Sequence, residues 1–98
     1  MNYNKDLVSQ SKQILQQVLE AEKLKKPIDA LVKRQIALME AHHDEFVKMA
    51  DKEGIDTLQR ARIEIGLYSN IRAWAEKIGL PTDKYDNAIK VIQDKFLT

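Results

Sequence analysis

Three short breaks divide the chain into four segments, and these breaks read KLKKP, DKEGID and KIGLPTD. The segments cover residues 4–25, 27–53, 56–78 and 82–97, and each is longer than a typical strand. Apolar residues recur in them at spacings of three and four, which places them on one side of a helix. Because the breaks are short, consecutive helices should pack antiparallel. The sequence therefore predicts an all-α, antiparallel four-helix arrangement in a single domain of residues 1–98.

Residues that commonly begin or end helices stand at these breaks. Pro27 suits the first turn of the second helix, and Gly54 suits the position after its last turn. Asp56 with Gln59 resembles a capping box that opens the third helix, and Gly79 closes that helix. We expect the helix ends to lie close to these residues.

Composition excludes several classes of protein. The chain has 16 basic and 15 acidic residues, a net charge of +1, whereas a protein that binds duplex nucleic acid normally has a strongly basic face. It has no cysteine, so disulfides and thiolate metal sites are excluded. Neither an apolar run of roughly 18 residues nor a signal-peptide core is present. We expect a cytoplasmic protein without a membrane span.

Two adjacent histidines, His42 and His43, are the only histidines in the chain. Adjacent residues of a helix point about 100° apart and seldom bind one metal ion together. Glu40 and His43 form one Glu-x-x-His unit, but di-iron bundles need two such units. We interpret both histidines as residues at the edge of the core, and we expect no metal site.

Catalytic motifs are not recognisable either. The sequence has no glycine elbow, phosphate-binding loop or catalytic cysteine. We therefore expect no enzyme activity and no cofactor.

The predicted helix 56–78 has two apolar faces instead of one. The first face is a complete core stripe of Ile63, Leu67, Ile71, Trp74 and Ile78. The second face comprises Leu58, Ala61, Ile65, Tyr68 and Ala75. Another helix of the same chain, a partner protein or a second copy has to cover it, and we expect Leu58, Ala61, Ile65 and Tyr68 to form an interface between copies. Gly66 lies in the middle of this helix, so we expect a close approach of backbones there.

Four polar or aromatic residues accompany the second face, and they are Arg62, Tyr68, Ser69 and Arg72. Arginine offers a planar donor group for phosphate, and tyrosine can stack on a base. These residues predict a surface for a small anionic ligand or a partner. Glu76 lies four residues after Arg72, however, and an ion pair within the helix would neutralise that arginine.

The run RIEIGLYSNIRAW resembles the last helix of small phage proteins that sequester cyclic oligonucleotides and thereby silence bacterial antiphage signalling. The resemblance covers residues 27–78, about half of the chain, and of the candidate ligand residues only Arg72 is carried over. It implies a self-assembling helical hairpin in the host cytoplasm whose partner is a cyclic oligonucleotide or a host protein. The chain departs from that family by its fourth segment, DKYDNAIKVIQDKF.

The stretch NIRAWAEKIGLPTDKYDNAIKVIQDKF is similar in layout to the last helix-turn-helix of class II bacteriocin immunity proteins, which are cytosolic four-helix bundles. The expected function is a non-enzymatic, self-associating helical binding module, most specifically a phage-type inhibitor of bacterial defence. This inhibitor would sequester a signalling nucleotide or a defence protein. The alternative is a bacteriocin immunity protein or another adaptor that binds a protein partner.

Overall fold

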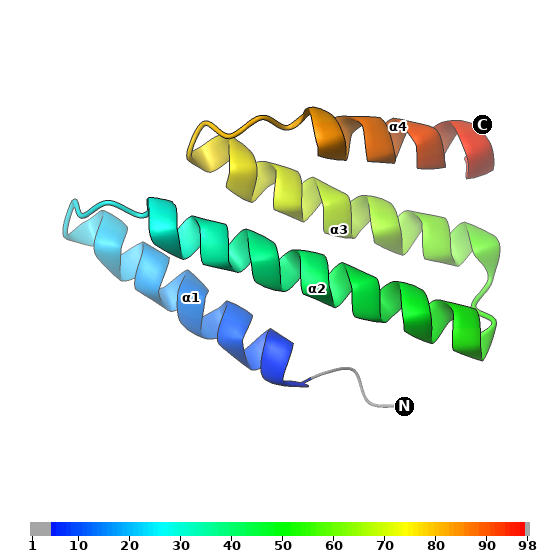
Figure 1. Ribbon diagram of the computed structural model, residues 1–98, viewed down its shortest axis with the longest axis horizontal. Coiled ribbons are helices and arrows are strands. Elements are labelled where there is room, and N and C mark those ends of the chain that lie inside the picture. Colours follow the sequence, from blue (N-terminus) through cyan, green and yellow to red (C-terminus); the bar gives the residue numbers. More distant parts are fainter. Residues whose placement is uncertain (1–4, 98) are drawn as a thin grey trace.

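The computed structural model describes residues 5–97, which form four α-helices. These are α1 (Lys5–Lys23), α2 (Asp29–Glu53), α3 (Thr57–Lys77) and α4 (Asp83–Phe96). Consecutive helices run antiparallel and lie side by side in chain order (Figure 1). The predicted all-α arrangement of four helices is confirmed; residue 4, the expected start of the first helix, lies outside the described residues.

Three of the predicted helix ends are confirmed by their backbone geometry. Gly54 and Gly79 follow α2 and α3 with φ angles of 65° and 74°, the left-handed conformation that favours glycine. The Asp56 carboxylate accepts a hydrogen bond of 3.2 Å from the Gln59 backbone N–H at the start of α3. These contacts place the α2–α3 turn close to where the sequence predicts it.

The α1–α2 turn differs from its prediction because α1 ends at Lys23 and α2 begins at Asp29. Lys25 has a φ of 57°, and the Lys26 backbone N–H donates to the Ala21 carbonyl at 2.8 Å, which closes α1 in a Schellman motif. Pro27 therefore precedes α2 instead of lying in its first turn. Because Lys25, and not a glycine, adopts the left-handed conformation, no glycine marks the end of α1 in the sequence.

The core lies where all four helices contribute side chains. Its buried members are Ile14, Val18, Val32, Ile36, Ile71, Ala75 and Tyr85. Phe46 and Ala50 are buried further along α2. The core is small because only part of each apolar stripe is enclosed.

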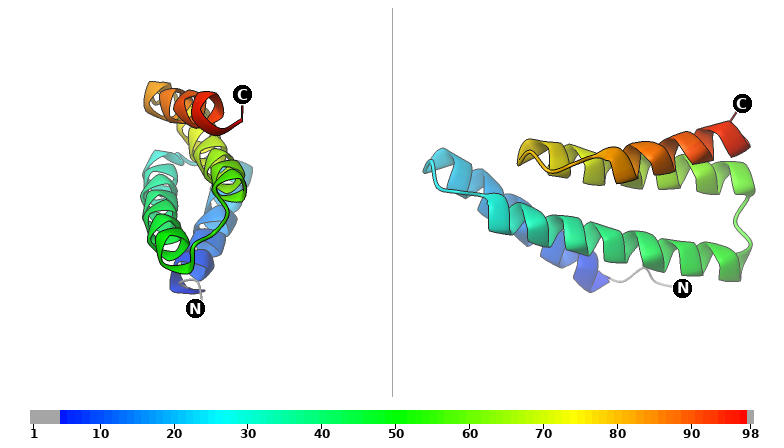
Figure 2. Two further views of the ribbon diagram at one scale, coloured as in Figure 1. Left: turned by 90° about the vertical axis from the view of Figure 1, so that its right-hand side faces the viewer. Right: turned by 45° about the horizontal axis from the view of Figure 1, so that its top comes forward.

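The helices form an open arrangement in chain order instead of a closed bundle. Among the described residues, backbone contacts join α1 to α2, α2 to α3 and α3 to α4 only. The molecule measures 44 × 30 × 15 Å along its principal axes. Figure 2 shows α4 lying along α3 on the side away from α1. Within residues 5–97, no helix has the length and apolar character needed to cross a bilayer.

Candidate functional site

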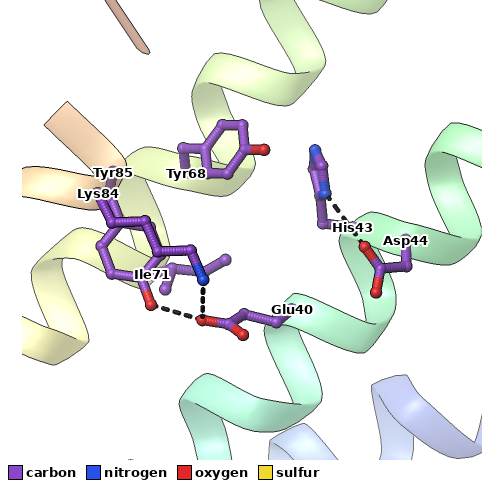
Figure 3. A pocket seen from close by; sticks show the side chains of 7 residues that line it. All are labelled: Glu40, His43, Asp44, Tyr68, Ile71, Lys84 and Tyr85. Carbon is purple, nitrogen blue, oxygen red and sulfur yellow. Dashed lines mark hydrogen bonds and ion pairs between the residues drawn. The ribbon is translucent and has the colours of Figure 1, made fainter. Parts of the chain in front are cut away.

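A pocket of about 250 Å³ lies between α2, α3 and α4, and we call it the tyrosine pocket (Figure 3). It is lined by Glu40, His43, Asp44, Tyr68, Ile71, Lys84 and Tyr85. The first three come from α2, the next two from α3 and the last two from α4. The pocket therefore depends on the relative placement of three helices.

Tyr85 and Glu40 join α4 to α2 across this pocket. The Tyr85 hydroxyl donates a 2.6 Å hydrogen bond to Glu40 Oε1, and Lys84 Nζ lies 3.7 Å from the same oxygen. Burial raises the pKa of Tyr85 to about 12, with further contributions from the hydrogen bond to Glu40 and from its charge. The hydroxyl therefore stays protonated and remains a donor at neutral pH.

His43 occupies the opposite wall of the pocket, with its side chain only 12% exposed. Its Nε2 atom lies 2.9 Å from Glu64 Oε1, and its Nδ1 atom lies 3.8 Å from Asp44 Oδ1. Its ring lies 4.5 Å from the Tyr68 ring, measured between centroids, and is tilted by 44°. The ring is thus held between carboxylates and an aromatic face.

His42 and His43 are both partly buried, in agreement with the prediction that they lie at the edge of the core. Burial lowers the pKa of His42, which favours its neutral form. In residues 5–97, no three histidine or carboxylate side chains are grouped so that they could hold a metal ion.

The structure does not bring the four predicted ligand residues together. Arg62 and Ser69 are exposed on α3, whereas Tyr68 lines the tyrosine pocket. Arg72 donates to Asp86 Oδ1 at 2.5 Å and to Glu76 Oε2 at 2.7 Å. The hydrogen bond to Asp86 raises the pKa of Arg72, and two carboxylates neutralise its charge. Arg72 is therefore poorly suited to bind an anion.

The second apolar face of α3 is partly covered by α4 of the same chain. Ala61 is only 1% exposed and lines the same hollow as Phe96 of α4, so it is not available to another copy in this arrangement. Tyr68 and Ile65 are half-buried, whereas Leu58 is 40% exposed. No close approach to Gly66 occurs within the described chain, because a Cβ atom at this position would meet no side chain and no backbone of another element within 4 Å.

A second hollow, which we call the α1–α3 groove, lies between α1 and the C-terminal half of α3. It has a volume of about 220 Å³ and is lined by Leu15, Val18, Leu19, Glu22, Ala73, Trp74 and Lys77. Leu15 is 40% exposed and Leu19 is 58% exposed, although both recur with Ile14 and Val18 at the spacing of three and four residues that predicts one buried side of this helix. Lys77 Nζ and Glu22 Oε2 form an ion pair of 3.0 Å across the groove. Apolar spacing predicts this helix, but it does not show that Leu15 and Leu19 on one side of α1 stay exposed.

Neither a protein-family model nor a curated protein or solved structure matches this chain. The tyrosine pocket and the α1–α3 groove are therefore identified from the residues of this chain alone.

Proposed function

We propose that this chain is a non-enzymatic, self-associating helical binding module. The observation that supports it is the α1–α3 groove, where Leu15 and Leu19 expose large apolar side chains next to Trp74. Val8 on α1 and Ile63 on α3 are also exposed apolar residues, by 36% and 38%. Contiguous apolar surface of this kind favours contact with another protein.

The partner that we propose for this surface is a second copy of the chain. Domains usually bury the apolar side of a helix against another element, and Leu15 and Leu19 on α1 are left exposed by 40% and 58%. A twofold pair would place the α1 flank of each copy against the groove of the other. The net charge of +1 gives two copies little mutual repulsion.

The role that fits such a module is inhibition by capture. The similarity of the run from Arg62 to Trp74 to phage sequestering proteins supports an inhibitor of bacterial defence that acts in the host cytoplasm. Because Asp86 and Glu76 neutralise Arg72, we propose a defence protein as the target in preference to a signalling nucleotide.

Changing Leu19 to Glu tests self-association. The charge would lie inside the proposed pair, where an unpaired carboxylate is strongly disfavoured, yet it would face solvent in a single copy. We therefore expect wild-type protein to scatter light as an oligomer and Leu19→Glu to scatter as a monomer with unchanged helical circular dichroism.

The matched control is Val91→Glu on α4, because Val91 is 62% exposed and does not line the groove. This variant should remain oligomeric. A wild-type chain that is monomeric at high concentration, or loss of the oligomer in both variants, would contradict the proposal.

A further inference from the structure

We propose that the tyrosine pocket binds an alkylammonium group, the chemical group shared by lysine side chains and polyamines. This inference goes beyond self-association, because the pocket lies between α2, α3 and α4, and none of its lining residues belongs to the α1–α3 groove. A monomer and an oligomer would both present the site.

The walls of the pocket suit the two parts of such a ligand. The Tyr68 and Tyr85 rings lie 6.4 Å apart between centroids, and the His43 ring lies against Tyr68. Tyrosine ring faces attract cations. The buried Ile71 side chain adds an apolar surface for the alkyl stem.

The charges of the lining also favour a cation. Glu40 and Asp44 supply two carboxylates, and Lys84 is the only lysine or arginine among the lining residues. Glu64 adds a third carboxylate behind His43, at 2.9 Å from Nε2. An anion would meet these carboxylates with one flexible lysine as its sole cationic partner.

Lys84 already places an ammonium group at this site. Its Nζ atom lies 3.7 Å from Glu40 Oε1 and 5.7 Å from the centroid of the Tyr85 ring (Figure 3). Its side chain is 73% exposed, so it can leave the pocket mouth for solvent without disturbing the core. We infer that Lys84 occupies the position that a ligand ammonium would take, and that it competes with the ligand.

This competition predicts opposite effects for two substitutions. Lys84→Ala removes the competing cation and should tighten ligand binding by about three- to tenfold. Glu40→Gln removes the carboxylate charge but keeps an oxygen that can accept from the Tyr85 hydroxyl, and it should weaken binding by about tenfold. A role of Glu40 and Lys84 in folding alone would not produce these opposite changes.

The experiment is a titration of the full chain with n-butylammonium chloride, followed by NMR of the ring protons of His43, Tyr68 and Tyr85. Sodium chloride at equal ionic strength is the reference titration. We expect a dissociation constant of roughly millimolar size for this small probe. The His42 ring, which does not line the pocket, should not shift, and Lys90→Ala on the exposed face of α4 should bind like wild type.

Two further probes identify the source of the ligand and test the opposite charge. Binding of spermidine that is tighter than that of butylammonium would favour a free polyamine, and equal binding would favour a single lysine side chain of a partner. Inorganic phosphate should leave the ring signals unchanged. The proposal is overturned if butylammonium shifts no ring signal in either wild type or Lys84→Ala, if Lys84→Ala weakens binding, or if phosphate binds through Lys84.

Discussion

Gln35 is a polar residue in an otherwise apolar part of the core. Only 3% of its surface is exposed, and its side-chain Oε1 atom has no hydrogen-bond partner within the described part of the chain. Val32 and Ile36, its near neighbours on α2, are both buried. A buried acceptor without a hydrogen bond costs roughly 1–3 kcal/mol. This residue therefore lowers the stability of the fold.

Replacing Gln35 with Met should raise the free energy of unfolding by about 1 kcal/mol, because the side chain keeps its length and loses the unpaired carbonyl. Urea unfolding at one fixed protein concentration measures the change. Gln17→Met on the exposed side of α1 is the control, and it should have no effect. A loss of about 1 kcal/mol in Gln35→Met would show that the oxygen makes a stabilising contact.

Contacts between individual residues were predictable only within a helix. The pair Arg72 and Glu76 follows from their spacing of four residues. Tyr85 and Glu40 are 45 positions apart, and His43 and Glu64 are 21 apart. Their pairing depends on how each helix is rotated about its axis and on the register between helices, which apolar spacing does not determine. The tyrosine pocket could therefore not be predicted as a site.

At the scale of elements, α4 is attached to α3 through a small polar network. Asp86 accepts from Arg72 at 2.5 Å and from the Thr82 hydroxyl at 2.9 Å. The hydrogen bond from Arg72, followed by that from Thr82, lowers the pKa of Asp86 below its ordinary value. A lowered pKa means that folding favours the ionised carboxylate.

Arg72→Ala should destabilise α4, and the loss should depend on pH. Stability from a carboxyl of lowered pKa is fully present above its unfolded pKa of about 3.9 and is lost as pH falls through the folded value. The difference in unfolding stability between wild type and Arg72→Ala should thus be largest near neutral pH and shrink below pH of about 4.

Denaturant unfolding across this pH range measures that difference, and hydrogen exchange of α4 amides localises it. Arg62→Ala is the matched control, because Arg62 is an exposed arginine of the same helix for which we expect no contribution to α4 attachment. A difference that stays constant through acid pH would show that the Asp86 charge is not responsible.

The helices themselves were largely predictable, because local chemistry determines where they end. Gly54, Asp56 and Gly79 each have the backbone geometry or hydrogen bond that their residue type favours. The end of α1 was misplaced because Lys25, instead of glycine, adopts the left-handed conformation. Which residue adopts the left-handed conformation depends on the whole turn and not on one residue type.

At the scale of the whole molecule, four helices form an open arrangement with an uncovered apolar flank. The antiparallel order follows from short connections, but α1 buries Ile14 and Val18 while leaving Leu15 and Leu19 exposed. Spacing alone treats these four residues as one stripe. The surface that we propose for self-association therefore became visible only from the placement of α1 relative to α3.

Trp74 offers the most direct test of that surface, because it is the only tryptophan of the chain and lines the α1–α3 groove. Emission spectra are recorded over a dilution series of wild type, Leu19→Glu and Val91→Glu. Pairing through the groove predicts that concentrated wild type and Val91→Glu emit at shorter wavelength than Leu19→Glu, since a second copy shields the indole from water. Identical emission of wild type and Leu19→Glu at every concentration would contradict self-association through this groove.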